Sequence, residues 1–310
     1  MRGSAFIAGR VAGRCQLTAA EAAAASLAAS AVASKAVYHD PTVLRKAPMH
    51  HQLVEADITK EWRRAQLEAF PSKYHGYRLA VPESASGDDW FPTPHGITCT
   101  DACFAFPEIF RGKDVVELGG GIGNQTILLI HAQARSVTVT EIDDSRHNQN
   151  RAMLELNKGL LHNLDGTGSV VTYIVQDWMR FKFRADVIIT NPPFCMSGQP
   201  RRRHFIDALC HLSRDALTED GKLVFSQSSM ADVEQTLQTL KEYAFDAKII
   251  LSADFYWRDY YAKDEKFLEE VDELQQRTGG KAYYTKGGKR VERIYVVEAT
   301  KKPFEPNLKH

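Results

Sequence analysis

DVVELGGGIGNQTILLIHA, residues 114–132, is the stretch that decides the fold. Residues 114–118 predict a strand, and residues 124–132 predict a helix. The loop between them carries glycines at 119, 121 and 123. Residues without a Cβ let a ligand approach the backbone, and free N–H groups at the start of a helix offer donors to it. The stretch therefore predicts a strand, a ligand-binding loop and a helix in succession.

The same alternation continues to the end of the chain. Six further strands are predicted, at 136–142, 169–177, 185–190, 222–228, 247–253 and 293–299, and helices are predicted at 148–157, 205–217 and 233–243. Strands that alternate with helices form a parallel, doubly wound sheet. We therefore expect an α/β, Rossmann-like fold with a mostly parallel sheet of seven strands.

Other segments flank or interrupt this pattern. A β-hairpin is predicted from 77–81 and 90–94, around the turn-rich PESASGDD, and a helix over 100–106 has to stop near Pro107. Residues 254–292 are too many for a plain connection between the last two strands, so they form an insertion.

The N-terminal residues differ in composition from the rest. Within residues 1–35 alanine dominates, and Arg2, Arg10 and Arg14 precede the first acid, Glu21. This composition is typical of a mitochondrial transit peptide, with a disordered or loosely helical tail in the cytoplasm as the alternative. Residues 36–70 are expected to be a linker and a short helix (57–70). The main domain is expected over 71–302, followed by a tail at 303–310.

The bulk numbers limit the class of protein. The 310 residues include 39 Lys+Arg and 39 Asp+Glu, so no global field draws the chain to nucleic acid or to an anionic membrane. Five cysteines form no repeated pair, which argues against a metal site or a disulfide framework. No bound metal is therefore expected. No run of about 18 strongly apolar residues occurs, so a soluble protein is expected.

Two predicted strands end in carboxylates. Glu141 lies twenty residues after Gly121, where an acid can accept hydrogen bonds from two ribose hydroxyls; a solvated strand end is the alternative. Asp177 can accept from an adenine amino group while Trp178 covers the ring, although Asp177 can equally cap the next turn. The dinucleotide fingerprint needs glycine at 124, where Asn124 stands, and this excludes a nicotinamide-dependent oxidoreductase.

VVELGGGIG (115–123), the acid at 141, QDW (176–178) and NPPF (191–194) together resemble the class I S-adenosylmethionine-dependent methyltransferases. In that family, Asn-Pro-Pro followed by an aromatic residue marks enzymes that methylate a planar amide or amine nitrogen. The likeness spans about 70–300. It implies that S-adenosylmethionine is the cofactor and that these residues bind it: Glu117, Gly119, Gly121, Gly123, Glu141, Ile142, Asp177, Trp178 and Asn191.

Within this family, the predicted hairpin resembles the small-domain N-methyltransferases. These include the release-factor glutamine methyltransferases and the guanine or adenine N-methyltransferases that act on ribosomal and transfer RNA. Two features depart from their pattern, namely GGG at 119–121 and the lack of an evident five-helix recognition domain. These departures put a polypeptide substrate in doubt.

The NPPF motif implies a mechanism for the acceptor side. Its catalytic residues are Asn191, Pro192, Pro193 and Phe194. A planar nitrogen is a poor nucleophile, so the Asn191 side-chain oxygen and the Pro192 carbonyl each accept one hydrogen, while Phe194 packs on the plane of the group. The prolines keep both acceptors in place. A strand-ending turn is the alternative, and Cys195 is interpreted as packing.

Two segments bear on the acceptor molecule. Arg201, Arg202 and Arg203 could contact phosphates or form a solvated face. FYWRDYY (255–261) could be a wall for a flat substrate or a local core, and Phe267, Val271 and Leu274 form a stripe that is expected to pack. We therefore expect a macromolecular partner, RNA slightly ahead of protein, and both ahead of a small molecule. A catalytically silent assembly module is the alternative, and nothing indicates an oligomeric state.

Overall fold

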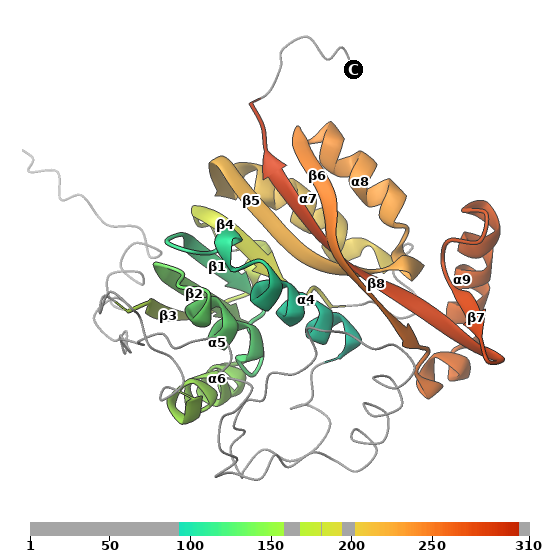
Figure 1. Ribbon diagram of the computed structural model, residues 1–310, viewed down its shortest axis with the longest axis horizontal. Coiled ribbons are helices and arrows are strands. Elements are labelled where there is room, and N and C mark those ends of the chain that lie inside the picture. Colours follow the sequence, from blue (N-terminus) through green and yellow to red (C-terminus); the bar gives the residue numbers. More distant parts are fainter. Residues whose placement is uncertain (1–92, 158–167, 181, 194–201, 304–310) are drawn as a thin grey trace, which may run out of the picture. The chain divides into compact units, whose positions relative to one another are not determined.

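The computed structural model describes residues 93–157, 168–180, 182–193 and 202–303. Their strands belong to one sheet and comprise β1 (Asp114–Leu118), β2 (Ser136–Glu141), β3 (Val170–Val175), β4 (Ala185–Thr190), β5 (Leu217–Ser228), β6 (Phe245–Tyr256), β7 (Tyr284–Lys286) and β8 (Lys289–Lys301). The order across the sheet is β3-β2-β1-β4-β5-β8-β6, with β7 paired to β8 (Figure 1).

The first five strands of this sheet are parallel, and β8 runs antiparallel between β5 and β6. The strand order reverses at β1, which lies between β2 and β4. In open α/β sheets such a reversal is the place where ligands bind, outside the carboxyl ends of the strands. The predicted α/β, mostly parallel sheet is thus confirmed, and the short β7 is the one described strand that the sequence did not predict.

Helices cover both faces of the sheet (Figure 1). One core cluster joins it to α4 (Pro94–Ala105), α5 (Asn124–His131) and α6 (Asp144–Asn157). The other joins it to α7 (His204–Ala216) and α8 (Val233–Glu242), while α9 (Glu265–Arg277) belongs to the insertion. Short 3-10 turns complete the description: η2 (Pro107–Ile109), η4 (Trp178–Arg180), η6 (Ser229–Ala231) and η7 (Asp259–Lys263).

The helix expected over 100–106 ends as predicted but begins earlier. The Thr93 side chain accepts a hydrogen bond from the Gly96 N–H at 3.2 Å, and Pro94 occupies the first helical position, where its missing N–H is no loss. Pro94 therefore cannot belong to the return strand of the expected hairpin. The rest of that hairpin, the helix over 57–70, the linker and the N-terminal tail lie outside the described residues.

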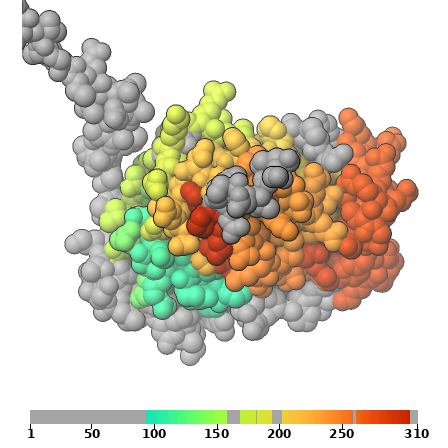
Figure 2. Space-filling model, turned by 90° about the horizontal axis from the view of Figure 1, so that it is seen from above, coloured from blue at the N-terminus to red at the C-terminus, as the bar shows by residue number. Residues whose placement is uncertain are grey.

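The insertion predicted at 254–292 is shorter than expected, because β6 continues to Tyr256 and β8 begins at Lys289. It has a core of its own, which contains Met230, Tyr261, Phe267, Val271, Leu274 and Ala282. The ring of Trp257 packs on this core, and its centroid lies 5.9 Å from that of the Tyr261 ring. Trp257 and Tyr261 of the aromatic cluster therefore belong to a local core, and the predicted packing stripe on α9 is confirmed. Figure 2 shows the insertion residues gathered on one side of the surface.

Candidate active site

A cavity of about 170 Å³ lies where β1 and β4 end. It is lined by residues of the glycine loop, of α4, α5 and α6, and of the segment after β4: Thr93, Gly96, Thr100, Glu117, Gly119, Gly120, Gly121, Ile122, Asn124, Gln125, Arg146 and Asn191. Three predicted site elements therefore meet in one place, namely Glu117, the first part of the glycine loop and Asn191.

Glycine is needed at different positions of the loop for different structural reasons. Gly121 has φ +51°, and a Cβ there would meet no protein atom within 4 Å, so the space beside it belongs to the cavity. A Cβ on Gly123 would lie 2.7 Å from Oδ1 of Asn150. Gly123 is thus required by packing on α6 and is absent from the cavity lining, unlike Gly119 and Gly121.

Glu117 is a buried carboxyl at the base of the cavity, 1% exposed. Thr126 Oγ1 donates to its Oε2 at 2.5 Å, and Asn150 Nδ2 donates to Thr126 Oγ1 at 2.9 Å. Burial raises the pKa of Glu117 to about 8; the Thr126 hydrogen bond opposes this rise and the nearby Glu141 charge adds to it. Glu117 is therefore largely protonated at neutral pH unless a cation approaches it.

Glu141 joins the end of β2 to the glycine loop. Its Oε2 accepts from the Gly121 N–H at 3.0 Å, and its Oε1 accepts from the Ile142 N–H at 2.8 Å. Each carboxylate oxygen keeps a lone pair for a further donor. The next side chain, Ile142, is 71% exposed, so the strand ends in an acid followed by an uncovered apolar residue.

Asn191 is held from the neighbouring strand. Ser226 Oγ, on β5, donates to Asn191 Oδ1 at 2.8 Å, and Thr190 Oγ1 donates to the Leu118 carbonyl at 2.8 Å. Pro192 is buried and Pro193 is exposed. Phe194 and Cys195, also named from the sequence, lie outside the described residues. The described part of the motif is thus a fixed amide beside the cavity.

Residues 104–249 match the family model described as "Methyltransferase small domain". The resemblance to class I S-adenosylmethionine-dependent methyltransferases is thereby confirmed. The family also implies S-adenosylmethionine as the cofactor of this domain, and it names no substrate.

Solved structures with a similar chain path were also found. A proposed RNA methyltransferase of Pyrococcus horikoshii is 14% identical, with a TM-score of 0.47 over 72% of this chain and 93% of its own. A methyltransferase from Pyrococcus furiosus is 15% identical, with a TM-score of 0.42 over 79% of this chain and 98% of its own. The ribosomal protein L11 methylase of Lactobacillus delbrueckii subsp. bulgaricus is 17% identical, with a TM-score of 0.37 over 63% of this chain and 77% of its own. At such identities their substrates do not transfer to this chain. A search of curated proteins gives no match.

Asp177 and Trp178 follow β3 in this methyltransferase domain. Asp177 Oδ1 accepts from the Met179 N–H at 3.0 Å, so it caps the η4 turn, the alternative left open by the sequence. Trp178 is 8% exposed and lies in the core, with its ring centroid 6.1 Å from that of Phe205. Core packing therefore accounts for Trp178 without a ligand. The second carboxylate oxygen of Asp177, Oδ2, makes no capping bond and pairs with Arg180 Nε at 3.6 Å.

The arginine run does not form a phosphate-binding or solvated face in its described part. Arg202 is 3% exposed and Arg203 is 1% exposed. Arg203 donates to the Asp232 carbonyl at 2.8 Å and to Thr236 Oγ1 at 2.6 Å. Arg202 donates to the Met230 carbonyl at 3.2 Å and lies 4.7 Å from the ring centroid of Phe267. Arg202 therefore joins η6 to the insertion, and Arg203 holds the start of α8. Arg201 lies outside the described residues.

Several residues around the domain's cavity carried no sequence signal. Thr126 and Asn150 lie in ordinary helical segments, and only the packing of α5 on α6 brings Asn150 to Thr126, which donates to Glu117. Ser226 lies in a correctly predicted strand, but its contact with Asn191 depends on the β4–β5 register, in which Thr190 pairs with Phe225. Within the described residues no helix has the length and apolarity to span a bilayer, and no three His, Cys, Asp or Glu side chains are grouped as a metal site.

Proposed function

We propose that the chain is an S-adenosylmethionine-dependent N-methyltransferase that acts on a planar nitrogen. One observation carries the proposal: Glu117, the backbone of Gly121 and the motif residue Asn191 line a single cavity. A methyl donor on the glycine loop and an amine on Asn191 would therefore lie next to each other, which is the first requirement for transfer.

The ionisable residues of this cavity suit the methionine end of the cofactor. That end carries an ammonium and a carboxylate, and the ionisable side chains in the lining are Glu117 and Arg146, of opposite sign. Glu117 would hold the ammonium and Arg146 the carboxylate. A cation next to Glu117 favours its ionised form and would offset the effect of burial on its pKa.

The adenosine end finds matching groups beyond the glycine loop. Glu141 keeps lone pairs for ribose hydroxyls, and Asp177 can accept from the adenine amino group. Ile142 follows the end of β2, Val175 is the last residue of β3, and Met179 lies in the η4 turn; these residues are 71, 51 and 39% exposed. Uncovered apolar side chains at these positions suit a purine ring, and they take the role that the sequence assigned to Trp178.

On the acceptor side, Asn191 and Pro192 would orient the reacting nitrogen. S-adenosylmethionine supplies an electrophilic methyl group. The Asn191 Oδ1 has two lone pairs, of which Ser226 Oγ uses one. The other lone pair and the Pro192 carbonyl can accept the two hydrogens of an N–H2 group, so that its remaining electron density faces the methyl carbon. As the new N–C bond forms, the S–CH3 bond of the donor would break and S-adenosylhomocysteine would leave. The proton on the nitrogen becomes acidic only then and would pass to water, so no base has to act first.

Both an RNA nucleobase amine and a protein glutamine amide have the planar N–H2 group that this geometry suits. The test is to incubate the protein with radiolabelled S-adenosylmethionine and a lysate treated with either ribonuclease or protease. Label that survives protease and is lost with ribonuclease identifies RNA as the acceptor, and the reverse identifies protein. Label in neither polymer but in small molecules favours a small-molecule N-methyltransferase.

A methyltransferase domain can also be catalytically silent and serve in assembly. Calorimetric titration with S-adenosylhomocysteine separates this alternative from the proposal, because the proposed site has to bind the cofactor product. Absence of binding, with the protein folded, would contradict the proposed function.

A further inference from the structure

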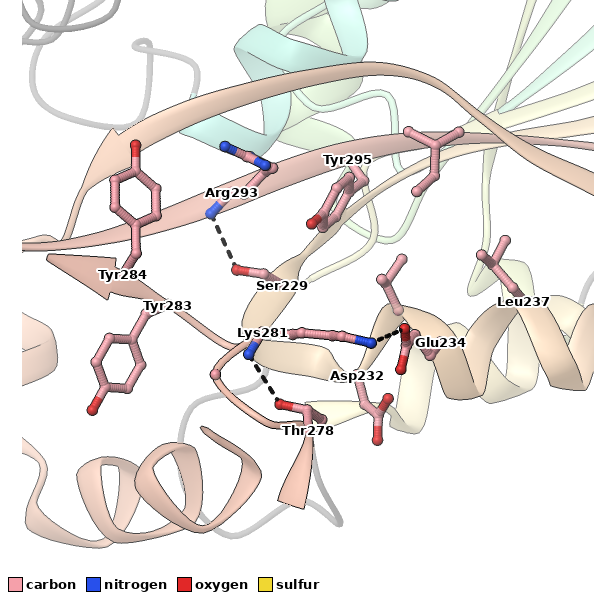
Figure 3. Close-up of a pocket in the computed structure, with 13 residues that line it drawn as sticks. Ser229, Asp232, Glu234, Leu237, Thr278, Lys281, Tyr283, Tyr284, Arg293 and Tyr295 are labelled. Carbon is pink, nitrogen blue, oxygen red and sulfur yellow. Dashed lines mark hydrogen bonds and ion pairs between the residues drawn. The ribbon is translucent and has the colours of Figure 1, made fainter. Parts of the chain in front are cut away.

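A second and larger cavity, of about 400 Å³, lies on the other side of the β5 end. Its walls come from the first turn of α8, from β6 and β8, and from the segment that links α9 to β7 (Figure 3). This volume falls within the range of about 300–1,000 Å³ that ligand-binding cavities have. The α9–β7 segment and β8 lie beyond residues 104–249, so the family match covers only the part of this cavity formed by η6, α8 and β6.

Aromatic and apolar side chains form one wall of the cavity. Tyr284 and Tyr295 lie along β7 and β8 (Figure 3), and Ile249 stands on β6. Tyr284 is 37% exposed and Ile249 is 41% exposed, so both keep accessible apolar surface. The Tyr284 hydroxyl donates to Asp254 Oδ2 at 2.8 Å, which fixes the ring while its surface stays accessible. Rings that are fixed and exposed suit the stacking of a nucleobase.

The segment 281–293 along this wall is rich in cations, although the chain as a whole is neutral and the cavity lining balances Lys281 and Arg293 with Asp232 and Glu234. Residues 281–293 contain five cations and one acid, Glu292, and the acid is fully buried. All the charged side chains that this segment leaves accessible are therefore cations: Lys281, Lys286, Lys289, Arg290 and Arg293. A flexible or extended polyanion would find complementary charge here.

The ion pairs at the cavity do not cancel this charge equally. Lys281 pairs with Glu234 at 2.5 Å, and the two side chains are 62 and 59% exposed. Such an exposed pair contributes little, so Lys281 can exchange Glu234 for a phosphate. Arg293 holds Asp254 through two hydrogen bonds of 2.6 and 2.9 Å, and it stays next to the Tyr284 ring.

The cavity is close to the acceptor motif along the chain. Ser226 holds Asn191, and Ser229, three residues later, lines the cavity. Three residues span at most about 11 Å even when fully extended. A polymer whose reacting base is held by Asn191 would therefore reach this cavity with a nearby nucleotide.

We propose that this cavity binds an unpaired nucleotide of an RNA acceptor, close to the base that is methylated. Its base stacks on Tyr284 and Tyr295, and the adjoining phosphates meet Lys281 and Lys286. The inference rests on the proposed function for its choice of acceptor, and it assigns the docking of RNA to a surface outside the methyl-transfer site.

The test is the binding of a fluorescent oligouridine of about ten nucleotides, a length within the site sizes of single-strand binders, followed by anisotropy. Tyr284→Ala should weaken binding by roughly 10-fold, while Tyr284→Phe, which keeps the ring but loses the hydroxyl that donates to Asp254, should weaken it less. Lys281→Gln should reduce the slope of log K against log salt by about 0.7. Lys302→Gln, which removes an exposed lysine outside the cavity, is its matched control and should leave binding at this cavity unchanged.

Thermal unfolding of each variant shows that it is folded. Tyr295→Ala removes the second stacking ring and should also weaken oligouridine binding. Equal binding by wild type, Tyr284→Ala and Tyr295→Ala would overturn the proposal, as would a wild type that does not bind. Equally tight binding of a poly-glutamate peptide would overturn the choice of RNA. Titration with S-adenosylhomocysteine keeps the two ideas apart: if it binds and oligouridine does not, this surface is wrong and the proposed function stands.

Discussion

Glu117→Gln should stabilise the unliganded protein at neutral pH and weaken its binding of the cofactor. Burial raises the pKa of Glu117 from its ordinary 4.5 to about 8. The folded state therefore holds this proton more tightly than the unfolded chain, and stability falls as pH rises from about 4.5 to about 8. Over that window the loss amounts to about 5 kcal/mol, of which about 3 kcal/mol is reached at pH 7. Glutamine keeps an acceptor for Thr126 and cannot ionise.

The assay is urea unfolding at pH 5.5 and pH 7, with S-adenosylhomocysteine affinity measured at the same pH values. In the wild type, affinity should rise by up to about tenfold per pH unit below pH 8, because the ligand's ammonium favours ionised Glu117. In Glu117→Gln the affinity should be lower and independent of pH. The gain in stability should be about 2 kcal/mol larger at pH 7 than at pH 5.5.

Glu292 provides the matched control. Glu292 is fully buried, and burial raises its pKa to about 7. The hydrogen bond from Ser228, the charge of Arg258 and the hydrogen bond from Tyr261 lower the pKa and so oppose this rise. Glu292 lies outside the cavity lining. Glu292→Gln should therefore also gain stability with rising pH and bind S-adenosylhomocysteine as the wild type does. The reasoning is refuted if Glu117→Gln keeps both the pH dependence and the affinity of the wild type.

Gly121→Val should abolish cofactor binding in a protein that still unfolds cooperatively, because the new side chain enters the cavity; calorimetry checks this, and wild-type affinity would contradict it. Gly120→Ala should instead destabilise the fold by about 1–3 kcal/mol, since its Cβ would lie 2.2 Å from Val139 Cγ1; a urea midpoint equal to that of the wild type would show that the loop adapts. A fluorescent fusion of residues 1–35 should enter mitochondria, and a diffuse cytosolic signal would count against a transit peptide.

The regular part of the fold could be predicted from the sequence because its signals are local. The strand 114–118, the glycine loop and the strand 185–190 lie where hydrophobic runs and glycines indicated. The start of α4 was missed because Thr93 and Pro94 also suit a turn after a strand, and only the cap hydrogen bond decides between the two.

The functional site could be predicted in part, for a related reason. Motif residues such as Asn191 are recognisable in the sequence, whereas Ser226 becomes its partner only through strand register. The arginine run shows the opposite failure. Charge in sequence suggests a surface, yet Arg202 and Arg203 are buried, where they pair with backbone carbonyls, with Glu270 of α9 and with Asp207 of α7.

The most direct test of the central claim is to identify the methylated product made by the wild type and by Asn191→Ala. Labelled acceptor is digested to nucleosides or amino acids after a single turnover at saturating S-adenosylmethionine. The account predicts a methyl group on nitrogen and a transfer rate that falls by about 10²-fold or more in Asn191→Ala, with S-adenosylhomocysteine affinity nearly unchanged. A methyl group on oxygen or carbon, or equal rates in the two proteins, would contradict it.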